Sequence, residues 1–335
     1  MLDMNAGVIG YPVDHSLSPR IHNAVYGALG VPWSYGLLPA PSEEDVDDIV
    51  GEGRMQALRA RSPEDAMAGF NVTTPHKKKA FYAADCKNVS SFIVGGANTL
   101  TFTEECSDGS CGYVLSCDTT DGEGACRALE HSGAPVEGAS ILILGTGAAA
   151  MSIMVSAIMR GAARVNVASR DVSRAHDTVS GILSRAGEAS SAGMLDFWGF
   201  GDDARAVNWR PLDADGIVVG YDEAPAISRS ADIVVNATPL GMNPGDGSPL
   251  PADSFRRGQL VMDAVYAHGL TGFRSAAADA GAYAIDGLAM LVEQALLSIA
   301  IWLPVHGFGF SAKDPAVYRI LSDAGIDVPY PRSGV

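Results

Sequence analysis

The stretch Ile141–Ala150, with the sequence ILILGTGAAA, has the residue types that bind a phosphate group. Four apolar residues suit a buried parallel strand, and Gly145 and Gly147 let the backbone turn sharply beside a bulky ligand. An Ala- and Met-rich helix over 148–162 follows, and its first N–H groups direct partial positive charge at the space that the glycines leave. We therefore predict a dinucleotide pyrophosphate site here, with Ala150 in place of the third glycine of G-x-G-x-x-G. The alternative is an ordinary strand-to-helix turn.

Ser16 and Ser18 place two hydroxyl groups at a junction between a loop and a helix. Because Pro19 favours the first turn of a helix, we expect a helix to begin near Arg20 with Ser18 as its N-cap. Two hydroxyls spaced by one residue also suit a small carboxylate. Both interpretations stay open at this point.

Polar side chains follow several of the predicted strands. Lys77 comes soon after a strand over 68–72, on the first turn of a helix; Asn98 lies in GGANTL; and CDTTDGEG at 117–124 follows a strand over 112–115. If these strands share one parallel sheet, the side chains meet at its edge, where open α/β sheets bind ligands. Lys78 and Lys79 are interpreted as ordinary surface lysines.

The elements that must position these residues alternate along the chain in β-α-β order. In the second half, we expect strands at 141–144, 164–168, 217–219, 232–236, 259–262 and 282–285. The region from about 187 to 230 is Gly- and Asp-rich and is interpreted as a surface excursion. In the closing helix, Met290, Gln294, Leu297 and Ile301 share one face. Gln294 is either a core glutamine with its own helix partners or a partner for a hydroxylated ligand.

Composition narrows the class of protein. With 335 residues, 47% hydrophobic and 19% charged, the chain is long enough for two soluble domains. A net charge of −16 argues against nucleic acid or an anionic membrane as partner.

The N-terminus lacks a signal-peptide pattern, so we expect a cytoplasmic location. The apolar run 285–303 contains enough polar residues to be interpreted as a buried helix and not a membrane span. Five cysteines without a CxxC pair indicate neither a disulfide framework nor a metal site.

Taken in order, the motifs resemble those of the shikimate dehydrogenase family. They are Ser-x-Ser-Pro at 16–19, NVTTPHK at 71–77, GGANT at 95–99, TDGEG at 120–124, the glycine turn, NATPLGM at 236–242, DAVY at 263–266 and GLAMLVEQA at 287–295. The resemblance covers nearly the whole chain. It implies two α/β domains: a discontinuous substrate domain with a mainly parallel sheet over 1–120 and 288–335, and a Rossmann-type NAD(P)-binding domain over 121–287.

The resemblance also implies an activity, the reversible NADPH-dependent reduction of 3-dehydroshikimate to shikimate in aromatic amino-acid (chorismate) biosynthesis. Hydride delivery to a ketone builds negative charge on oxygen, so a positioned acid is needed, and Lys77 with Asp121 is the expected proton-transfer pair. By resemblance, Ser16, Ser18 and Tyr266 bind the carboxylate, and Thr73, Asn98, Asp121 and Gln294 bind the ring hydroxyls. The expected NADP-binding residues are Gly145, Thr146, Gly147, Ala148, Ala149, Ser169, Arg170, Asp171, Arg174, Ala237, Thr238, Met242 and Gly287. No metal is expected, and the protein is expected to be a monomer or a homodimer.

The sequence departs from the family pattern at several positions. Lys78 stands where the family usually has an acidic residue, Thr119 where it has Asn, Gly96 where it has Ala, and Ala267-His268 where Asn-Pro is common. These departures leave open the alternative that the protein is an NAD-preferring quinate/shikimate dehydrogenase. A non-catalytic nucleotide-sensing Rossmann protein is the alternative from another class, and the presence of both Lys77 and Asp121 argues against it.

Ser169-Arg170-Asp171, after the second strand of the expected nucleotide domain, bears on the choice of cofactor. An acidic residue there accepts hydrogen bonds from the ribose of NAD, whereas an arginine pairs with the 2′-phosphate of NADP. The family usually has Asn-Arg-Thr, so Arg170 matches the NADP pattern and Asp171 replaces a threonine. Repulsion between Asp171 and the phosphate is expected to be offset by Arg170 and Arg174. We predict that NADP is favoured, with weaker discrimination than the family pattern gives and with NAD as a second cofactor.

Overall fold

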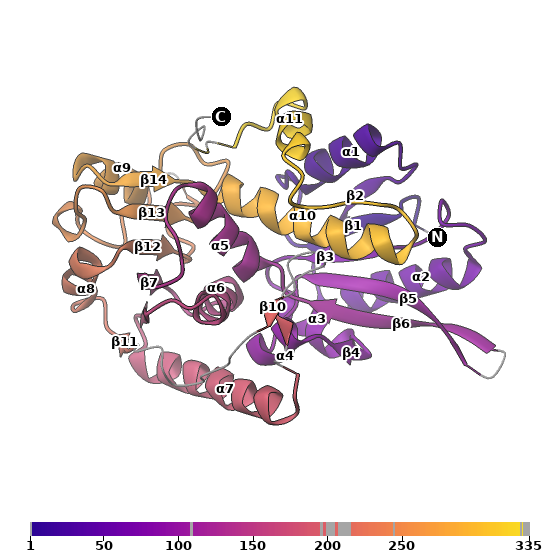
Figure 1. The fold of residues 1–335 in the computed structure, drawn as a ribbon, viewed down its shortest axis with the longest axis horizontal. Helices are drawn as coiled ribbons and strands as arrows, with labels where there is room; N and C mark the ends of the chain where they lie inside the picture. Colours follow the sequence, from indigo (N-terminus) through magenta and orange to yellow (C-terminus); the bar gives the residue numbers. More distant parts are fainter. Residues whose placement is uncertain are drawn as a thin grey trace. The chain divides into compact units, whose positions relative to one another are not determined.

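The computed structural model describes residues 2–107, 110–194, 197–198, 205–206, 216–243, 245–328 and 330. The chain divides into two compact units (Figure 1). Unit 1 comprises Met1–Thr120, Phe197–Arg205 and Ala295–Asp327, and unit 2 comprises Asp121–Asp196, Ala206–Gln294 and Val328–Val335. The chain passes from unit 2 back to unit 1 between Gln294 and Ala295, within helix α10 (Gly287–Val305).

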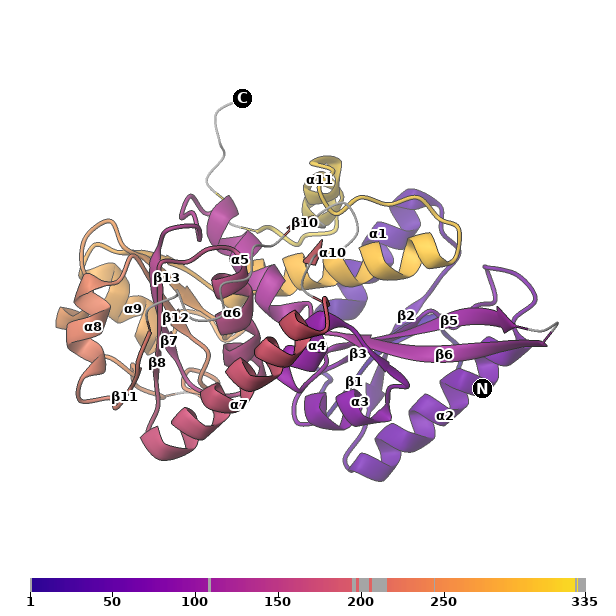
Figure 2. The ribbon, with the colours of Figure 1, turned by 60° about the horizontal axis from the view of Figure 1, so that its bottom comes forward.

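Unit 1 is built on a six-stranded mixed sheet in the order β2-β1-β3-β5-β6-β4. The strands are β1 (Ala6–Gly10), β2 (Tyr35–Pro39), β3 (Gly69–Val72), β4 (Cys86–Lys87), β5 (Thr99–Ser107) and β6 (Ser110–Asp118). β1 is parallel to β2 and β3, and β4 to β6, but β5 is antiparallel to both of its neighbours. Figure 2 shows β5 and β6 as a long hairpin. Because β5 runs in the opposite direction, its start meets the ends of β3 and β6 at one edge of the sheet.

The helices of unit 1 pack against its sheet or against one another. They are α1 (Ser18–Leu29), α2 (Glu43–Arg59), α3 (Lys77–Ala83), α4 (Val89–Val94) and α11 (Ala316–Asp323). Ser42 caps α2 in a reciprocal capping box with Asp45. Phe70 and Phe102 meet edge to face in the core, with ring centroids 5.9 Å apart.

Unit 2 is built on a parallel sheet in the order β11-β8-β7-β12-β13-β14. Its strands are β7 (Ser140–Leu144), β8 (Arg164–Ala168), β11 (Val218–Val219), β12 (Ile233–Asn236), β13 (Leu260–Asp263) and β14 (Tyr283–Ile285). Its helices are α5 (Asp121–His131), α6 (Ala148–Met159), α7 (Val172–Ser191), α8 (Ala224–Ser230), α9 (Gly272–Asp279) and the first part of α10. Counted along the chain, the strand order is 3-2-1-4-5-6, which is the order of the Rossmann fold that the resemblance implied.

Two local predictions need correction. Helix α1 begins at Ser18 rather than near Arg20, and its N-cap is Leu17, which makes no side-chain capping bond. The expected excursion at 187–230 begins inside α7 and ends in β11 and α8, because the amphipathic helix continues to Ser191. The two-residue strands β9 (Phe197–Trp198) and β10 (Arg205–Ala206) also fall in it, and residues 195–196, 199–204 and 207–215 lie outside the described part.

Helix α10 is the predicted buried helix. Among the described residues, it is the one helix long and apolar enough to cross a membrane by length and composition, with a mean hydropathy of 1.9. However, 67% of its most apolar window is buried inside the molecule. Its apolar surface is therefore used in the protein core.

Candidate active site

The glycine turn after β7 has the geometry of a phosphate cradle. Gly145 has φ +106°, a conformation that L side chains rarely adopt, and a Cβ there would lie 3.1 Å from the carbonyl oxygen of Ala237. Gly147 is the N-cap of α6, has no side-chain capping bond, and would place a Cβ in open space. Ala150 is fully buried, as expected for a close contact between helix and strand. The exposed N–H groups of α6 therefore fit a dinucleotide pyrophosphate.

Four further expected NADP-binding residues lie at the end of β8. Asp171 is the N-cap of α7, and its Oδ1 accepts a hydrogen bond of 3.0 Å from the backbone N–H of Arg174. The backbone N–H of Asp171 donates to Ser169 Oγ at 3.2 Å. Arg170 and Arg174 are exposed. The Asp171 carboxylate thus lies at a positively polarised helix end, which offsets part of its charge.

Tyr221, which the sequence did not single out, belongs to the same corner of unit 2. Burial raises the pKa of Tyr221, and the charge of Arg170 partly offsets this rise. The phenol is therefore close enough to the guanidinium for their charges to interact.

A buried network holds together the ends of β12 and β13. Asp263 accepts hydrogen bonds from Asn236 Nδ2 at 2.9 Å and from Thr271 Oγ1 at 2.5 Å. Burial raises the pKa of Asp263, although the Thr271 hydrogen bond opposes the rise. Thr238 Oγ1 donates to Asn236 Oδ1 at 2.6 Å. The signal for this network in the sequence is that Asn236 and Asp263 each end an apolar strand.

The remaining expected residues of unit 2 lie on its loops and helices. Gly287 begins α10, and a Cβ there would lie 2.2 Å from the carbonyl oxygen of Ala264. Tyr266 is half-buried and Met242 is exposed. Asp121 begins α5 and is 5% exposed. Gln294 is 7% exposed, and its Nε2 donates to the carbonyl of Leu291 at 2.9 Å. Its own helix therefore supplies one of the partners that a buried amide needs.

In unit 1, Lys77 occupies the predicted position as the first residue of α3. It is half-buried, and its carbonyl accepts a hydrogen bond of 2.9 Å from the N–H of Ala97, which fixes the helix start beside the segment that carries Asn98. Lys78 is exposed, and Lys79 pairs with Asp47 at 2.7 Å. The three consecutive lysines are therefore in three different environments.

Asn98 is held by a buried polar network. Its Oδ1 accepts from the N–H of Thr120 at 2.7 Å, and its Nδ2 donates to Thr120 Oγ1 at 2.9 Å. Asn71 Nδ2 donates to the carbonyl of Asn98 at 3.2 Å and to Ser298 Oγ at 2.9 Å. These contacts fix the orientation of the Asn98 amide. The contribution of Ser298 was not predicted, because it comes from a helix about 200 residues away in sequence.

Ser16 and Ser18 lie together at the start of α1. Ser16 Oγ accepts from the N–H of Ser18 at 3.3 Å, and Ser18 is 5% exposed. The predicted N-cap role of Ser18 is wrong, because Ser18 is already inside the helix. Thr73 is half-buried after β3, and its carbonyl accepts from the N–H of His76 at 2.9 Å.

Asp118, at the end of β6, is a buried carboxyl group that the sequence analysis did not assign. It accepts from Asn88 Nδ2 at 2.6 Å and from Ser90 Oγ at 3.3 Å. Burial raises the pKa of Asp118 to about 6, although both hydrogen bonds oppose the rise. The carboxyl group thus holds its proton to a higher pH in the folded chain than in the unfolded chain.

We expect the Asp118→Asn variant to change how stability depends on pH. Since the folded pKa lies above the unfolded value, the contribution of Asp118 is fully present below the unfolded pKa near 3.8 and is lost as pH rises through about 6. The loss is about 3 kcal/mol. Urea unfolding of both proteins between pH 4 and 7.5 should show this loss as the difference between the pH dependence of the parent and that of the variant. Equal slopes in both proteins would contradict the assignment.

The described residues contain no group of three or more His, Cys, Asp or Glu side chains that could hold a metal ion. Cys86, Cys117 and Cys126 are free thiols.

Comparison with known proteins identifies the family. Residues 8–100 match the shikimate dehydrogenase substrate binding domain. The chain is 32% identical over 312 residues to the NADP(+) shikimate dehydrogenase of Methanocella arvoryzae, covering 92% of this chain and 97% of the relative. It is 35% identical over 300 residues to the enzyme of Rubrobacter xylanophilus, covering 89% and 90%.

Solved structures agree with the sequence comparison. The shikimate dehydrogenase of Thermus thermophilus, in complex with NADP(H) and shikimate, has a TM-score of 0.68 and 25% identity over 96% of this chain and 99% of that chain. A shikimate dehydrogenase in complex with NADP+ has a TM-score of 0.70 and 25% identity, covering 95% and 93%. The chain belongs to the shikimate dehydrogenase family.

Proposed function

We propose that this protein is an NADP-dependent shikimate dehydrogenase that reversibly reduces 3-dehydroshikimate to shikimate in chorismate biosynthesis. The observation that carries the proposal is the extent of the similarity: it spans 92% of this chain and 97% of an NADP(+) shikimate dehydrogenase. Two local structures support it: Lys77 begins α3, and the glycine turn leads directly into α6. We place the enzyme in the cytoplasm, as a monomer or a homodimer.

NADP, when bound, supplies the site that accepts or delivers a hydride. The residues that would hold it are those of the glycine turn, Ala237 and Thr238, and the Ser169–Arg174 segment. The uncapped N–H groups of α6 would bind the pyrophosphate, and the exposed Arg170 and Arg174 would pair with the 2′-phosphate.

The chain's own residues would manage the proton and the substrate. In the reductive direction, the Lys77 ammonium group donates a proton to the carbonyl oxygen as negative charge develops there, and Asp121 orients the lysine and balances its charge. Ser16, Ser18 and Tyr266 would bind the carboxylate, and Thr73, Asn98, Asp121 and Gln294 the ring hydroxyls. The fixed amide of Asn98 supports this assignment, because a preoriented group loses little freedom on binding.

The proposal is tested by measuring absorbance at 340 nm with shikimate and quinate, each combined with NADP+ and NAD+. We expect the highest kcat/KM with shikimate and NADP+. Preference for quinate with NAD+ would instead support the quinate/shikimate dehydrogenase assignment. Absence of turnover in all four combinations would contradict a dehydrogenase function on these acids.

We expect Ser18→Ala to weaken substrate binding without weakening the helix. Because Leu17 and not Ser18 is the N-cap of α1, no capping bond is lost. Loss of a hydrogen bond to the carboxylate should raise KM for shikimate by about 5- to 30-fold, which corresponds to roughly 1–2 kcal/mol. Steady-state kinetics and thermal melting check both statements. A lower Tm with an unchanged KM would assign Ser18 a purely structural role.

We expect Asp171→Thr to sharpen the preference for NADP. Threonine also caps helices, so α7 should keep its start, while a negative charge near the 2′-phosphate is removed. At an exposed site the gain is about 1 kcal/mol, or roughly fivefold in the ratio of kcat/KM for NADP to that for NAD. An equal change for both cofactors would show that Asp171 does not face the ribose.

A further inference from the structure

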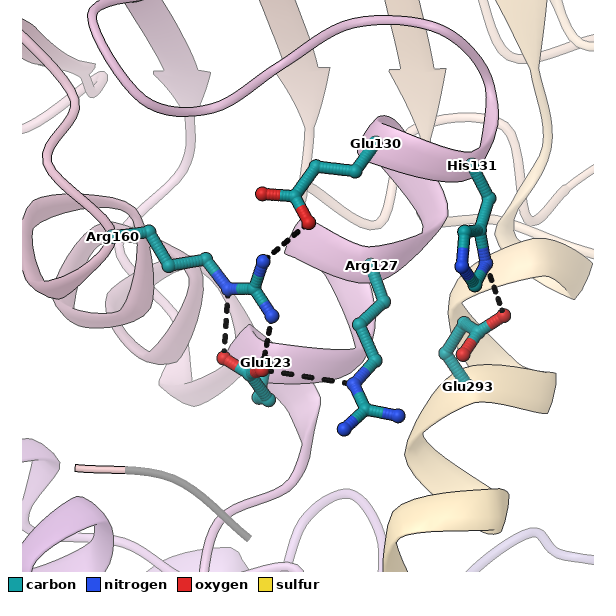
Figure 3. A network of polar contacts seen from close by, with 6 residues as sticks. All are labelled: Glu123, Arg127, Glu130, His131, Arg160 and Glu293. Atoms are coloured by element: carbon teal, nitrogen blue, oxygen red, sulfur yellow. Dashed lines mark hydrogen bonds and ion pairs between the residues drawn. The ribbon is translucent and has the colours of Figure 1, made fainter. Parts of the chain in front are cut away.

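Helices α5 and α6 are joined by a cluster of charged side chains, all buried except Glu130, whose side chain is 36% exposed (Figure 3). Arg160, the residue that ends α6, donates from Nε to Glu123 Oε2 at 3.0 Å and from Nη2 to Glu123 Oε1. Its Nη1 donates to Glu130. The side chains of Arg160 and Glu123 are only 2% and 3% exposed. Arg127 adds a second positive charge, with Nε 3.6 Å from Glu123 Oε1.

Stability alone is a weak explanation for such a cluster. Taking two charges out of water costs about as much as their attraction returns, so apolar residues of similar size would stabilise the contact as well. Burial by itself would lower the pKa of Arg160, but the hydrogen bonds and charge of Glu123 outweigh it and hold the pKa above its ordinary value. What the ion pair adds over apolar packing is a fixed geometry, because a guanidinium group binds a carboxylate in one plane.

The geometry is specific along the axis of α5. Glu123 and Glu130 lie two helical turns apart on one face of α5, and the single guanidinium of Arg160 binds both. A shift of α5 by one turn would break both contacts. Arg160 therefore fixes the register of α5 against α6.

Gly122 and Gly124, the residues on either side of Glu123, hold the first turn of α5 against the neighbouring helices α6 and α10. A Cβ at Gly122 would lie 2.0 Å from the carbonyl oxygen of Ser152 on α6, and the N–H of Gly122 donates to Ser152 Oγ at 2.9 Å. A Cβ at Gly124 would lie 2.7 Å from the backbone nitrogen of Gln294 on α10. The first turn of α5 is thus in backbone contact with two helices.

This turn begins with Asp121. We propose that Glu123 and Arg160 are positioning residues, which set Asp121 and Gln294 in the geometry that the reaction requires. The inference rests on the proposed function, in which Asp121 and Gln294 contact the substrate. Neither Glu123 nor Arg160 needs to touch substrate or cofactor for this role.

The test compares Glu123→Gln, Arg160→Gln and Arg160→Lys with the parent. The matched control is Arg54→Gln, because Arg54 on α2 pairs with Asp85 at 2.8 Å and its side chain is 35% exposed. Steady-state kinetics with shikimate and NADP+ should be measured well below the lowest Tm. We expect kcat to fall by about 10- to 100-fold in Glu123→Gln and Arg160→Gln, with KM for NADP+ within about twofold. Arg160→Lys, which keeps the charge without the planar fork, should be intermediate, and Arg54→Gln should match the parent.

A lower Tm with unchanged kcat in both Gln variants would overturn the inference, because the pair would then be structural only. If a Gln variant does not fold, Arg160→Lys still separates the two roles. A lower kcat in Arg160→Lys supports positioning, and an unchanged kcat supports a purely structural role. Hydrogen exchange at the N–H groups of 122–125 separates this inference from the proposed function. We expect at least about tenfold faster exchange there in Arg160→Lys even if the parent does not oxidise shikimate, and unchanged exchange would contradict the positioning role.

Discussion

Replacement of Lys77 by alanine is expected to lower kcat by a factor on the order of 10² to 10⁴ while KM for shikimate stays within a few-fold. The reason is that Lys77 is assigned the proton that the reacting oxygen gains or loses, an interaction made chiefly in the transition state. The fixed start of α3, bonded through the carbonyl of Lys77 to Ala97, should keep the fold intact in the variant.

Lys78→Ala is the matched control for this prediction, because Lys78 is adjacent in sequence and exposed. We expect its kcat to equal that of the parent. An unchanged kcat in Lys77→Ala, or an equal loss in both variants, would remove Lys77 from the proton-transfer role.

The second large effect is expected on acidification, at His22. This residue lies wholly inside unit 1, stacked on Tyr35 with ring centroids 4.0 Å apart, and its Nδ1 is 3.3 Å from the Tyr26 hydroxyl. Burial lowers the pKa of His22 to about 3. Because the folded pKa lies below the unfolded value, stability is fully present above the unfolded pKa near 6.5 and is lost as pH falls toward 3. The whole loss is roughly 5 kcal/mol, of which about 3 kcal/mol falls between pH 7 and 4.

His22→Phe keeps the stacked ring and removes the titrating group, so acidification from pH 7 to 4 should lower its stability in urea by about 3 kcal/mol less than it lowers that of the parent. His15→Gln, at an exposed histidine, should leave the acid-dependent loss unchanged. The effects of His22 and Asp118 have opposite signs between pH 4 and 7 and nearly equal size. The parent alone would therefore show little of either, and only the single variants separate them. A pH slope in His22→Phe equal to that of the parent would contradict the assignment.

The sequence predicted the parts of the structure that depend on local pattern. The apolar strand before Gly145 and the helix after Gly147 formed as expected, and unit 2 has the Rossmann-type sheet that the resemblance implied. In unit 1, the edge position of Asn98 was predicted on the basis of a parallel sheet. It arises instead because β5 is antiparallel, so that its first residues lie at the same edge.

What could not be predicted depends on contacts between distant residues. From the sequence alone, Glu123 is expected to be a solvent-exposed helix residue. In the structure it is buried because it pairs with Arg160 from another helix. Asp118 likewise has its partners, Asn88 and Ser90, in a segment that sequence spacing does not connect to it. The N-cap of α1 was predicted at Ser18 because Ser-Pro is a frequent helix start. In the structure the N-cap is Leu17, one residue earlier, and Ser18 is the first residue of the helix.

The most direct test of the central claim is the reverse reaction of the purified parent protein with 3-dehydroshikimate and NADPH. We predict a fall in absorbance at 340 nm, with one NADPH consumed for each shikimate formed, as measured by chromatography of the product. NADPH left intact in the presence of 3-dehydroshikimate, or consumed without formation of shikimate, would contradict the assignment of this protein as a shikimate dehydrogenase.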